Sequence, residues 1–174
     1  MKNKMTVMEY FFKNPTQKLR VRQIEREAKV PLPSAIRYAK ELEQESILKP
    51  TEIGGIKLYS ADLSSRKYKA KKQLFNLERI YSSGLIEYLI DKYDNPSIIV
   101  FGSFSKGEDT EKSDVDIYIE TPHRKVVVPS TFEKRIGLPL QLFVHKGLDE
   151  IDNINLKNNI VNGIVLNCFV EAFR

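Results

Sequence analysis

The chain has 174 residues, of which 41% are hydrophobic and 29% are charged, and its net charge is +5. This balance is typical of a globular protein with one large domain or two small ones. The single cysteine, Cys168, excludes an intramolecular disulfide and a cysteine-based metal cluster.

Cys168 lies in an apolar run, which predicts a small buried residue. No stretch reaches the apolar length of a membrane span, and residues 1–6 lack the apolar region of a signal peptide. We therefore expect a cytoplasmic protein without a membrane partner.

The charge is unevenly spread along the chain. Residues 1–80 carry 18 Lys and Arg against 9 Asp and Glu, a net charge of +9, whereas residues 81–174 carry 10 against 14, a net charge of −4. A basic half joined to an acidic half suggests two modules, the first of which has an anionic partner. Lys-rich surfaces also serve solubility alone, so the charge by itself does not identify that partner.

The first part of the chain has the apolar spacing of short helices. Helices are predicted over residues 5–14, 22–29 and 35–46. Ser34 precedes the third helix and is a good N-cap. The side chains that we expect to face the core are Val7, Met8, Phe11, Phe12, Ile24, Ala28, Ile36, Leu42 and, in part, Ala39.

A hairpin follows the helices. Gly54-Gly55 separates two expected strands, residues 47–50 and 56–59, and predicts a tight turn between them. Three short helices followed by a hairpin resemble the winged helix-turn-helix of prokaryotic transcription regulators, and residues 19–63 carry the resemblance. It implies that the third helix reads DNA and that the hairpin touches phosphate. The residues that it places toward DNA are Ser34, Arg37, Tyr38, Lys40 and Lys57.

The alternative for this module is a protein contact. Three acids, Glu41, Glu43 and Glu45, crowd the end of the third predicted helix and would repel DNA there. Winged modules also serve protein binding and dimerisation. We expect DNA as the partner and a homodimer as the assembly.

Residues 64–93 are predicted to be a helical connector. It starts with a basic cluster, residues 66–72, which either extends a nucleic-acid surface or is a solvated face. Ser82-Ser83-Gly84 predicts a break in the helix. The apolar residues at helical spacing before this break are Leu74, Leu77, Ile80 and Tyr81.

Residues 98–120 contain the candidate active site. An apolar run, residues 98–101, predicts a buried strand, and it ends in Gly102-Ser103, where small residues let backbone amides approach a ligand. A polar loop, residues 104–113, is expected next. Asp114 and Asp116 then open an alternating strand, so both carboxylates project from one face, about 7 Å apart along the strand.

Two neighbouring carboxylates suit hard cations such as Mg²⁺, which can hold and polarise the phosphates of a nucleotide. The alternative is a Ser-Asp turn followed by an exposed strand face. The order Gly-Ser, ten residues, Asp-x-Asp resembles the signature of the DNA polymerase β nucleotidyltransferase superfamily, and most closely its minimal prokaryotic members. That resemblance implies that Gly102 and Ser103 contact the triphosphate of an NTP and that Asp114 and Asp116 bind one or two Mg²⁺ ions.

Ser105-Lys106-Gly107 matches the family's small-basic-glycine loop, which implies that Ser105 and Lys106 also belong to the nucleotide site. Related minimal domains modify a toxin-like helical partner, so the resemblance also offers a protein as the acceptor.

The chain departs from the family at the third carboxylate. In active members this group lies on a later strand, and the corresponding residue here is Gln141. By alternation Gln141 can reach the site, but a neutral amide is a poor general base. Glu120 shares the face of Asp116 but lies about 13 Å farther along the strand. A substrate or partner is the other conceivable source of the missing group.

The rest of the chain is predicted to complete this second domain. We expect His123 in a solvated loop, a short helix over residues 131–136 and a strand over residues 138–144. Residues 148–174 are expected to be mostly helical, with Ile160, Val161, Ile164, Val165 and Phe169 on one apolar face.

The expected fold is α+β. It has a winged helix-turn-helix (residues 1–63), a helical connector (64–93) and a nucleotidyltransferase-type mixed sheet with helices (94–174). The leading hypothesis is a Mg²⁺-dependent enzyme that moves NMP from NTP to a hydroxyl acceptor and is localised by the DNA-binding module. The alternatives are a DNA-binding transcriptional regulator with a degenerate, nucleotide-sensing domain, and a structural dimerisation module.

Overall fold

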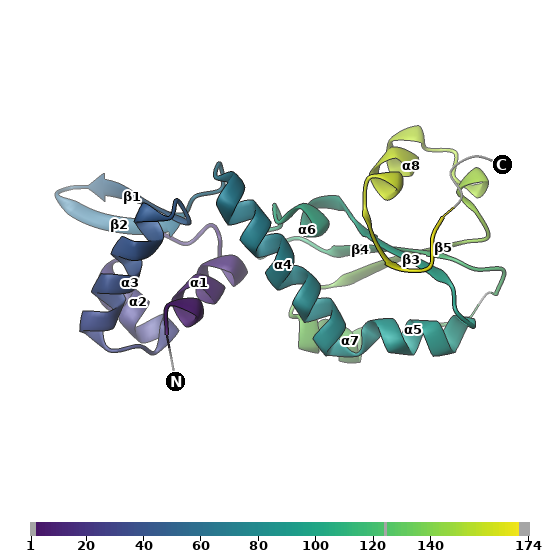
Figure 1. Cartoon of the computed structure of the whole chain (residues 1–174), viewed down its shortest axis with the longest axis horizontal. Coiled ribbons are helices and arrows are strands. Elements are labelled where there is room, and N and C mark those ends of the chain that lie inside the picture. The colour runs from purple at the N-terminus through teal and green to yellow at the C-terminus, as the bar shows by residue number, and fades with distance from the viewer. Residues whose placement is uncertain (1–2, 124, 171–174) are drawn as a thin grey trace. The chain divides into compact units, whose positions relative to one another are not determined.

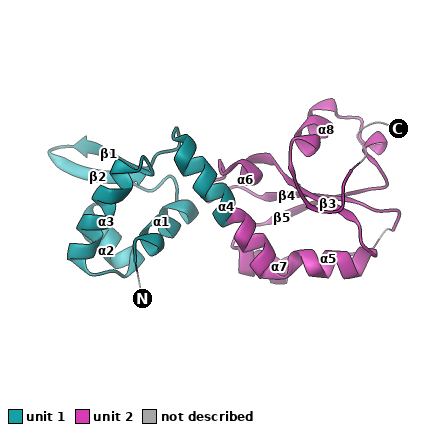
Figure 2. Ribbon diagram, viewed as in Figure 1, with its two compact units in different colours: residues 1–75 teal, residues 76–174 magenta. Residues whose placement is uncertain are grey.

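The structure is a computed structural model that describes residues 3–123 and 125–170. The chain packs as two compact units, Met1–Phe75 and Asn76–Arg174, which Figure 2 colours separately. Helices and a mixed sheet make it an α+β protein, as predicted. None of the helices within the described ranges combines the length and apolarity needed to cross a membrane.

The first unit contains three helices and a hairpin, followed by the start of α4 (Arg66–Ser83) (Figure 1). The helices are α1 (Lys4–Lys13), α2 (Val21–Ala28) and α3 (Leu32–Gln44). The strands are β1 (Leu48–Ile53) and β2 (Ile56–Ala61), which pair antiparallel. Gly54 and Gly55 have φ of +57° and +73°, the left-handed conformation that the predicted tight turn requires. Leu19 and Tyr59 exchange two backbone hydrogen bonds (2.9 and 2.8 Å), which tie the link between α1 and α2 to the hairpin.

The start of α3 differs from the prediction. Ser34 is not its N-cap, because the helix begins at Leu32 and Ser34 lies inside the first turn. Pro33 is compatible with that turn, where a backbone N–H would have no helical partner in any case. Ile36, predicted to face the core, is 52% exposed, because the buried positions of the helix are Ala35, Ala39 and Leu42.

The region predicted to be helical with a break, residues 64–93, contains two helices with a break between them. These are α4 (Arg66–Ser83) and α5 (Leu85–Tyr93). Gly84 separates them with φ of +77°. The Tyr68 hydroxyl donates to the Phe11 carbonyl of the first unit (3.2 Å), whereas Ile80 is buried in the second, so α4 contributes to both units.

The inward face of α4 was predicted wrongly in part. Leu74 is 67% exposed and Tyr81 is 46% exposed. The buried positions are Tyr68, Lys72, Asn76, Ile80 and Ser83, close to one per helical turn. Because three of these five residues are polar, apolar spacing did not reveal the face.

The second unit is built on a four-stranded mixed sheet with the order β5-β4-β3-β6. Its strands are β3 (Ser97–Phe101), β4 (Val115–Glu120), β5 (Leu140–His145) and β6 (Ile164–Asn167). The pair β4–β5 is parallel, and β3 pairs antiparallel with β4 and with β6.

The two faces of this sheet are covered by different helices (Figure 1). On β4, the side chains of Val115, Ile117 and Ile119 pack into a core shared with α5 and α7 (Ser130–Ile136). The alternate residues face the other way, where Tyr118 packs in a smaller cluster with α8 (Ile154–Val161). The alternation in β4 therefore directs Val115, Ile117 and Ile119 to the larger core and Asp116 to the opposite face.

The segment after β5 is less helical than predicted. It contains a short 3₁₀ turn (Leu148–Glu150), α8 and the strand β6, so Ile164 and Val165 lie on a strand and not on a helical face. Cys168 is exposed, with φ of +51°, and not buried in the core. Phe169 is 71% exposed, and residues 171–174 of the predicted helix lie outside the described residues. The predicted short helix is confirmed as α7, and His123 is exposed in a loop, as expected.

Gly163 allows the chain to turn from α8 into β6. A Cβ at this position would lie 2.5 Å from Ile99 Cγ2 and 2.7 Å from the Val100 carbonyl oxygen. We expect Gly163→Ala to lower the free energy of unfolding by about 1–3 kcal/mol, because the backbone oxygen cannot yield without disturbing β3. Urea unfolding measures this, with Val161→Ala, at a position 53% exposed, as the control that leaves stability nearly unchanged. Equal stability of the two variants would contradict the close approach.

Candidate functional site

The Gly-Ser element follows β3 directly. Phe101 ends the strand, and Gly102–Lys106 forms the short helix α6. The expected loop over residues 104–113 is therefore helical in its first turn. Ser105 is buried and its hydroxyl donates to the Gly102 carbonyl (2.9 Å), whereas Ser103 is half-buried and Lys106 is exposed.

A buried hydrogen-bond network anchors this element to α4. The Asn76 side-chain amide donates to the Phe104 carbonyl (2.9 Å) and to the Asp109 carboxylate (2.7 Å), and both Asn76 and Asp109 are buried. The network holds the segment between α6 and β4 against the helix, so that α6 and the start of β4 keep one relative position. Sequence reasoning missed both residues, since Asn76 lies in an apolar helical pattern and Asp109 is one of several acids in a polar loop.

A tight turn presents the two acids at the start of β4. The Thr110 amide donates to the Ser113 hydroxyl (2.9 Å), and the Ser113 amide donates back to the Thr110 carbonyl (3.1 Å). Asp114 comes directly after this turn and is exposed, and Asp116 lies on the strand and is half-buried. Asp116 is paired in the sheet with Phe101 on β3, so it lies beside the Gly-Ser element.

Gly102 is in close contact with one of these acids. Its φ is +73°, and a Cβ built on it would overlap Asp116 Oδ2. Glycine is therefore required here twice, for the backbone conformation and for the space that the carboxylate occupies. The contact shows that the two halves of the motif, which are separated by the α6 segment, meet at one point.

Gln141 completes the site from the third strand. It is the sheet partner of Asp116 on β5, and its side chain is exposed on the same face. With the amide nitrogen turned toward the acids, it donates to Asp114 Oδ2 (3.0 Å) and to Asp116 Oδ1 (3.1 Å). The alternation of β5 predicted this reach, and Leu140 and Leu142 pack against the core on the opposite face.

The electrostatics of the pair favour a positive partner. Partial burial, and the negative charge of Asp114 in addition, raise the pKa of Asp116 above its ordinary value. Among residues 3–123 and 125–170 there is no cluster of three His, Cys, Asp or Glu side chains suited to a metal. The side chains available to bind a cation are two carboxylates and one neutral amide, and this oxygen-rich set fits a hard cation such as Mg²⁺.

The raised pKa of Asp116 gives a pH dependence of stability. Between the unfolded pKa of this carboxyl and its raised folded pKa, the folded state binds a proton that the unfolded state has released, so stability falls as pH rises through this window and is level above it. Asp116→Asn removes this decline and should stabilise the cation-free protein at neutral pH by on the order of 1 kcal/mol. Thermal unfolding in EDTA across pH measures the difference between the two proteins; a constant difference at every pH would contradict it.

The residues predicted to face DNA lie mainly on α3 and on the hairpin, and several carry acidic neighbours. Arg37 stacks on Tyr38, with the guanidinium carbon 4.9 Å from the ring centroid, and its Nε is 3.6 Å from a Glu41 carboxylate oxygen. Lys57 Nζ donates to the Glu43 carboxylate (2.9 Å). Lys40 is exposed and Ser34 is half-buried. Two of the acids that were expected to repel DNA are thus paired with basic side chains that were expected to bind it.

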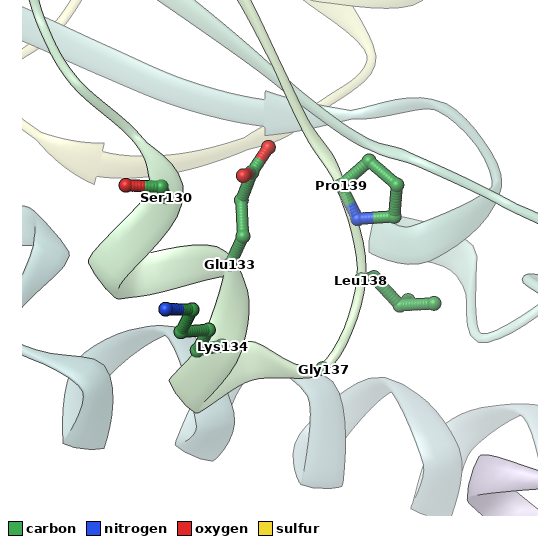
Figure 3. Close-up of a pocket in the computed structure, with 6 residues that line it drawn as sticks. All are labelled: Ser130, Glu133, Lys134, Gly137, Leu138 and Pro139. Atoms are coloured by element: carbon green, nitrogen blue, oxygen red, sulfur yellow. The ribbon is translucent and has the colours of Figure 1, made fainter.

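A surface pocket lies apart from the motif. It has a volume of about 350 Å³ and is formed by α7 and the segment that leads into β5 (Figure 3). The residues that line it are Ser130, Glu133, Lys134, Gly137, Leu138 and Pro139. None of them is a predicted site residue. Glu133 accepts a hydrogen bond from the Leu140 amide (3.0 Å), which stabilises the strand that carries Gln141.

Comparison with known proteins identifies the family of the chain. Residues 82–158, which include Gly102, both acids and Gln141, match the family model of the nucleotidyltransferase domain. The chain is 34% identical over 84 residues to a protein of Methanocaldococcus jannaschii that is named as a protein adenylyltransferase. The match covers 44% of this chain and 81% of that relative. No solved structure is significantly similar to the chain. With the Gly-Ser element, the Asp pair and the mixed sheet in one place, the chain belongs to the nucleotidyltransferase domain family.

Proposed function

We propose that the chain is a Mg²⁺-dependent enzyme that transfers a nucleoside monophosphate from NTP to a hydroxyl group of a protein. The observation that carries the proposal is the meeting of Gly102, Asp114 and Asp116 at the ends of β3 and β4. A glycine lets the backbone approach a phosphate chain closely, and the two carboxylates beside it can supply the ligands of a cation.

The proposed acceptor class rests on the relative. That protein is named as a protein adenylyltransferase, which points to ATP as the donor and to a protein hydroxyl as the acceptor. In the reaction the acceptor oxygen forms a bond to the α-phosphorus, the bond to the β-phosphate oxygen breaks, and pyrophosphate leaves. The acceptor proton goes to solvent or to a group of the substrate.

Each residue of the site has a proposed role. Asp114 and Asp116 hold Mg²⁺, which when bound neutralises charge on the α-phosphate. Gly102 and Ser103 contact the triphosphate, with Ser105 holding the turn of α6 and Lys106 reaching a phosphate from its exposed position. Gln141 cannot accept the proton of the attacking hydroxyl, so we expect slow transfer with simple alcohols and faster transfer with an acceptor that brings its own base.

The test is a transfer assay with each of the four NTPs labelled at the α-phosphate, in the presence of Mg²⁺, with protein and nucleic acid both offered as acceptors. We expect label on protein, most from ATP, and one pyrophosphate released for each nucleotide transferred. Label on nucleic acid alone would overturn the acceptor class. If a preparation that binds Mg²⁺ and NTP gives no label transfer and releases no pyrophosphate, the proposal that the chain is an enzyme is overturned.

For the first unit we propose a winged helix-turn-helix that binds DNA and localises the activity there. Its three helices, the hairpin and the excess of basic residues support this.

Glu43 is paired with Lys57, so Glu43→Gln should free Lys57 to contact a DNA phosphate. The affinity for duplex DNA should then rise by roughly 3–10-fold at low salt, and the salt dependence of binding should steepen by the equivalent of about one phosphate contact. Fluorescence anisotropy measures both, with Glu87→Gln in the second unit as the control; unchanged affinity would argue for a protein partner instead.

A second candidate is a DNA-binding regulator whose second unit senses a nucleotide without transferring it. The observation that favours it is the neutral Gln141 in place of a third carboxylate. This candidate predicts DNA affinity that changes when NTP and Mg²⁺ are added, with no label transferred. DNA affinity that does not respond to NTP would exclude it.

A further inference from the structure

Gln141 contacts both carboxylates of the site at once. With the amide turned so that its nitrogen faces the acids, the orientation that the two carboxylate oxygens require, this nitrogen lies 3.0 Å from Asp114 Oδ2 and 3.1 Å from Asp116 Oδ1. A side-chain amide carries two N–H groups on one nitrogen, so it can donate one hydrogen to each acid. Hydrogen bonds to ionised acceptors are about twice as strong as those between neutral groups. The geometry thus matches a bridge between the acids and not a single chance contact.

The position of Gln141 in the sheet makes this reach a built feature. Gln141 and Asp116 are direct partners in the parallel pair β4–β5, so their side chains leave the sheet side by side on the same face. The start of β5 is held from both sides. The Pro139 carbonyl accepts from the Val115 amide (2.8 Å), and the Leu140 amide donates to Glu133 (3.0 Å).

The bridge addresses a specific electrostatic problem. Without a cation, the two acids repel each other, and a third carboxylate on β5 would add to the repulsion. An amide at the same place adds no charge and offers two donors where a cation would otherwise supply the positive charge. Gly102 gives the Asp116 carboxylate its place beside Asp114, because a Cβ on residue 102 would overlap Oδ2.

We propose that Gln141 is a positioning residue, whose side-chain amide bridges Asp114 and Asp116 in the cation-free protein and keeps the two acids assembled. This inference rests on the proposed role of the acids as cation ligands. Gln141 cannot act as the general base that a carboxylate at this position would provide. The inference assigns it a different role, which is to hold the two acids together.

A double-mutant cycle on thermal unfolding in EDTA tests the bridge. Gln141→Leu, which keeps a branched side chain one bond shorter than glutamine and removes both hydrogen-bond donors, should lower the Tm of the wild-type protein by about 2–5 °C. The same change in the Asp114→Ala/Asp116→Ala background should have no effect, because the acceptors are gone. Gln141→Glu should lower the Tm more than Gln141→Leu, since it replaces two donors by a third negative charge.

An equal loss in both backgrounds, or no loss in either, would overturn the proposal. A second measurement covers the case in which a variant does not fold. The side-chain NH₂ protons of Gln141, identified by NMR from their absence in Gln141→Leu, should exchange slowly with solvent in EDTA, and faster at least tenfold once either Asp114 or Asp116 is changed to alanine. Exchange as fast as that of the exposed Asn155 amide in the wild type would also overturn it. Neither measurement uses NTP or an acceptor, so an inactive protein leaves this test intact, and a failed bridge leaves the transfer assay intact.

Discussion

Changing both Asp114 and Asp116 to asparagine should lower the rate of nucleotidyl transfer by about 1,000-fold or more, which corresponds to about 4 kcal/mol of transition-state stabilisation. The amides keep the size of the side chains but remove the two charges that are proposed to hold a divalent cation. Because the acids repel each other and Asp116 is partly buried, the same variant should unfold at an equal or higher temperature in EDTA.

The measurement is single-turnover transfer of the labelled nucleotide, with saturating Mg²⁺ and acceptor. Asp152→Asn is a matched control, since Asp152 is an exposed acid of the same unit outside the motif. Loss of activity together with loss of the folded state would point to a structural role for the acids. Full activity in the folded double variant would remove the proposed cation site.

Gly102→Ala should abolish cation-dependent nucleotide binding and lower transfer by about 100-fold or more. The new methyl group would overlap Asp116 Oδ2, and alanine is also strained at φ of +73°. To fit, the Asp116 side chain must leave its place beside Asp114 and Gln141, which disperses the ligand set. Binding of a fluorescent NTP analogue with Mg²⁺ measures the first effect, and single-turnover transfer measures the second.

Gly55→Ala separates strain from overlap. Gly55 has the same φ of +73°, but a Cβ there has no neighbour within 4 Å. Both variants should therefore bear the cost of the left-handed backbone, and only Gly102→Ala should lose the site. Equal nucleotide binding by the two variants would contradict the contact between Gly102 and Asp116.

The α+β class, the hairpin turn and the site-bearing strand could be predicted because each depends on nearby residues. In β4 the alternation of Val115, Asp116 and Ile117 defines both faces of the strand whatever it packs against. The turn at Gly54 and Gly55 follows in the same way from the backbone freedom of two glycines.

The errors arose where packing partners decide the outcome. The predicted helical face over the last residues placed Ile164 and Val165 on a helix, but Gly163 and the open edge of β3 make that segment a strand. Ile36 is exposed and its neighbour Ala35 is buried, because the elements that pack against α3 decide which of the two faces the core. Apolar residues alone could not indicate the inner face of α4, which is polar at Asn76.

By itself the sequence indicated the candidate site residues Gly102, Asp114 and Asp116, since they lie on a local strand, turn and strand. Only the tertiary structure decided how they meet. Gln141 reaches both acids because β5 pairs in parallel with β4, and Asn76 anchors the motif across 28 and 33 residues of chain. Such contacts depend on strand order and on helix packing between distant segments, which no local pattern of residues contains.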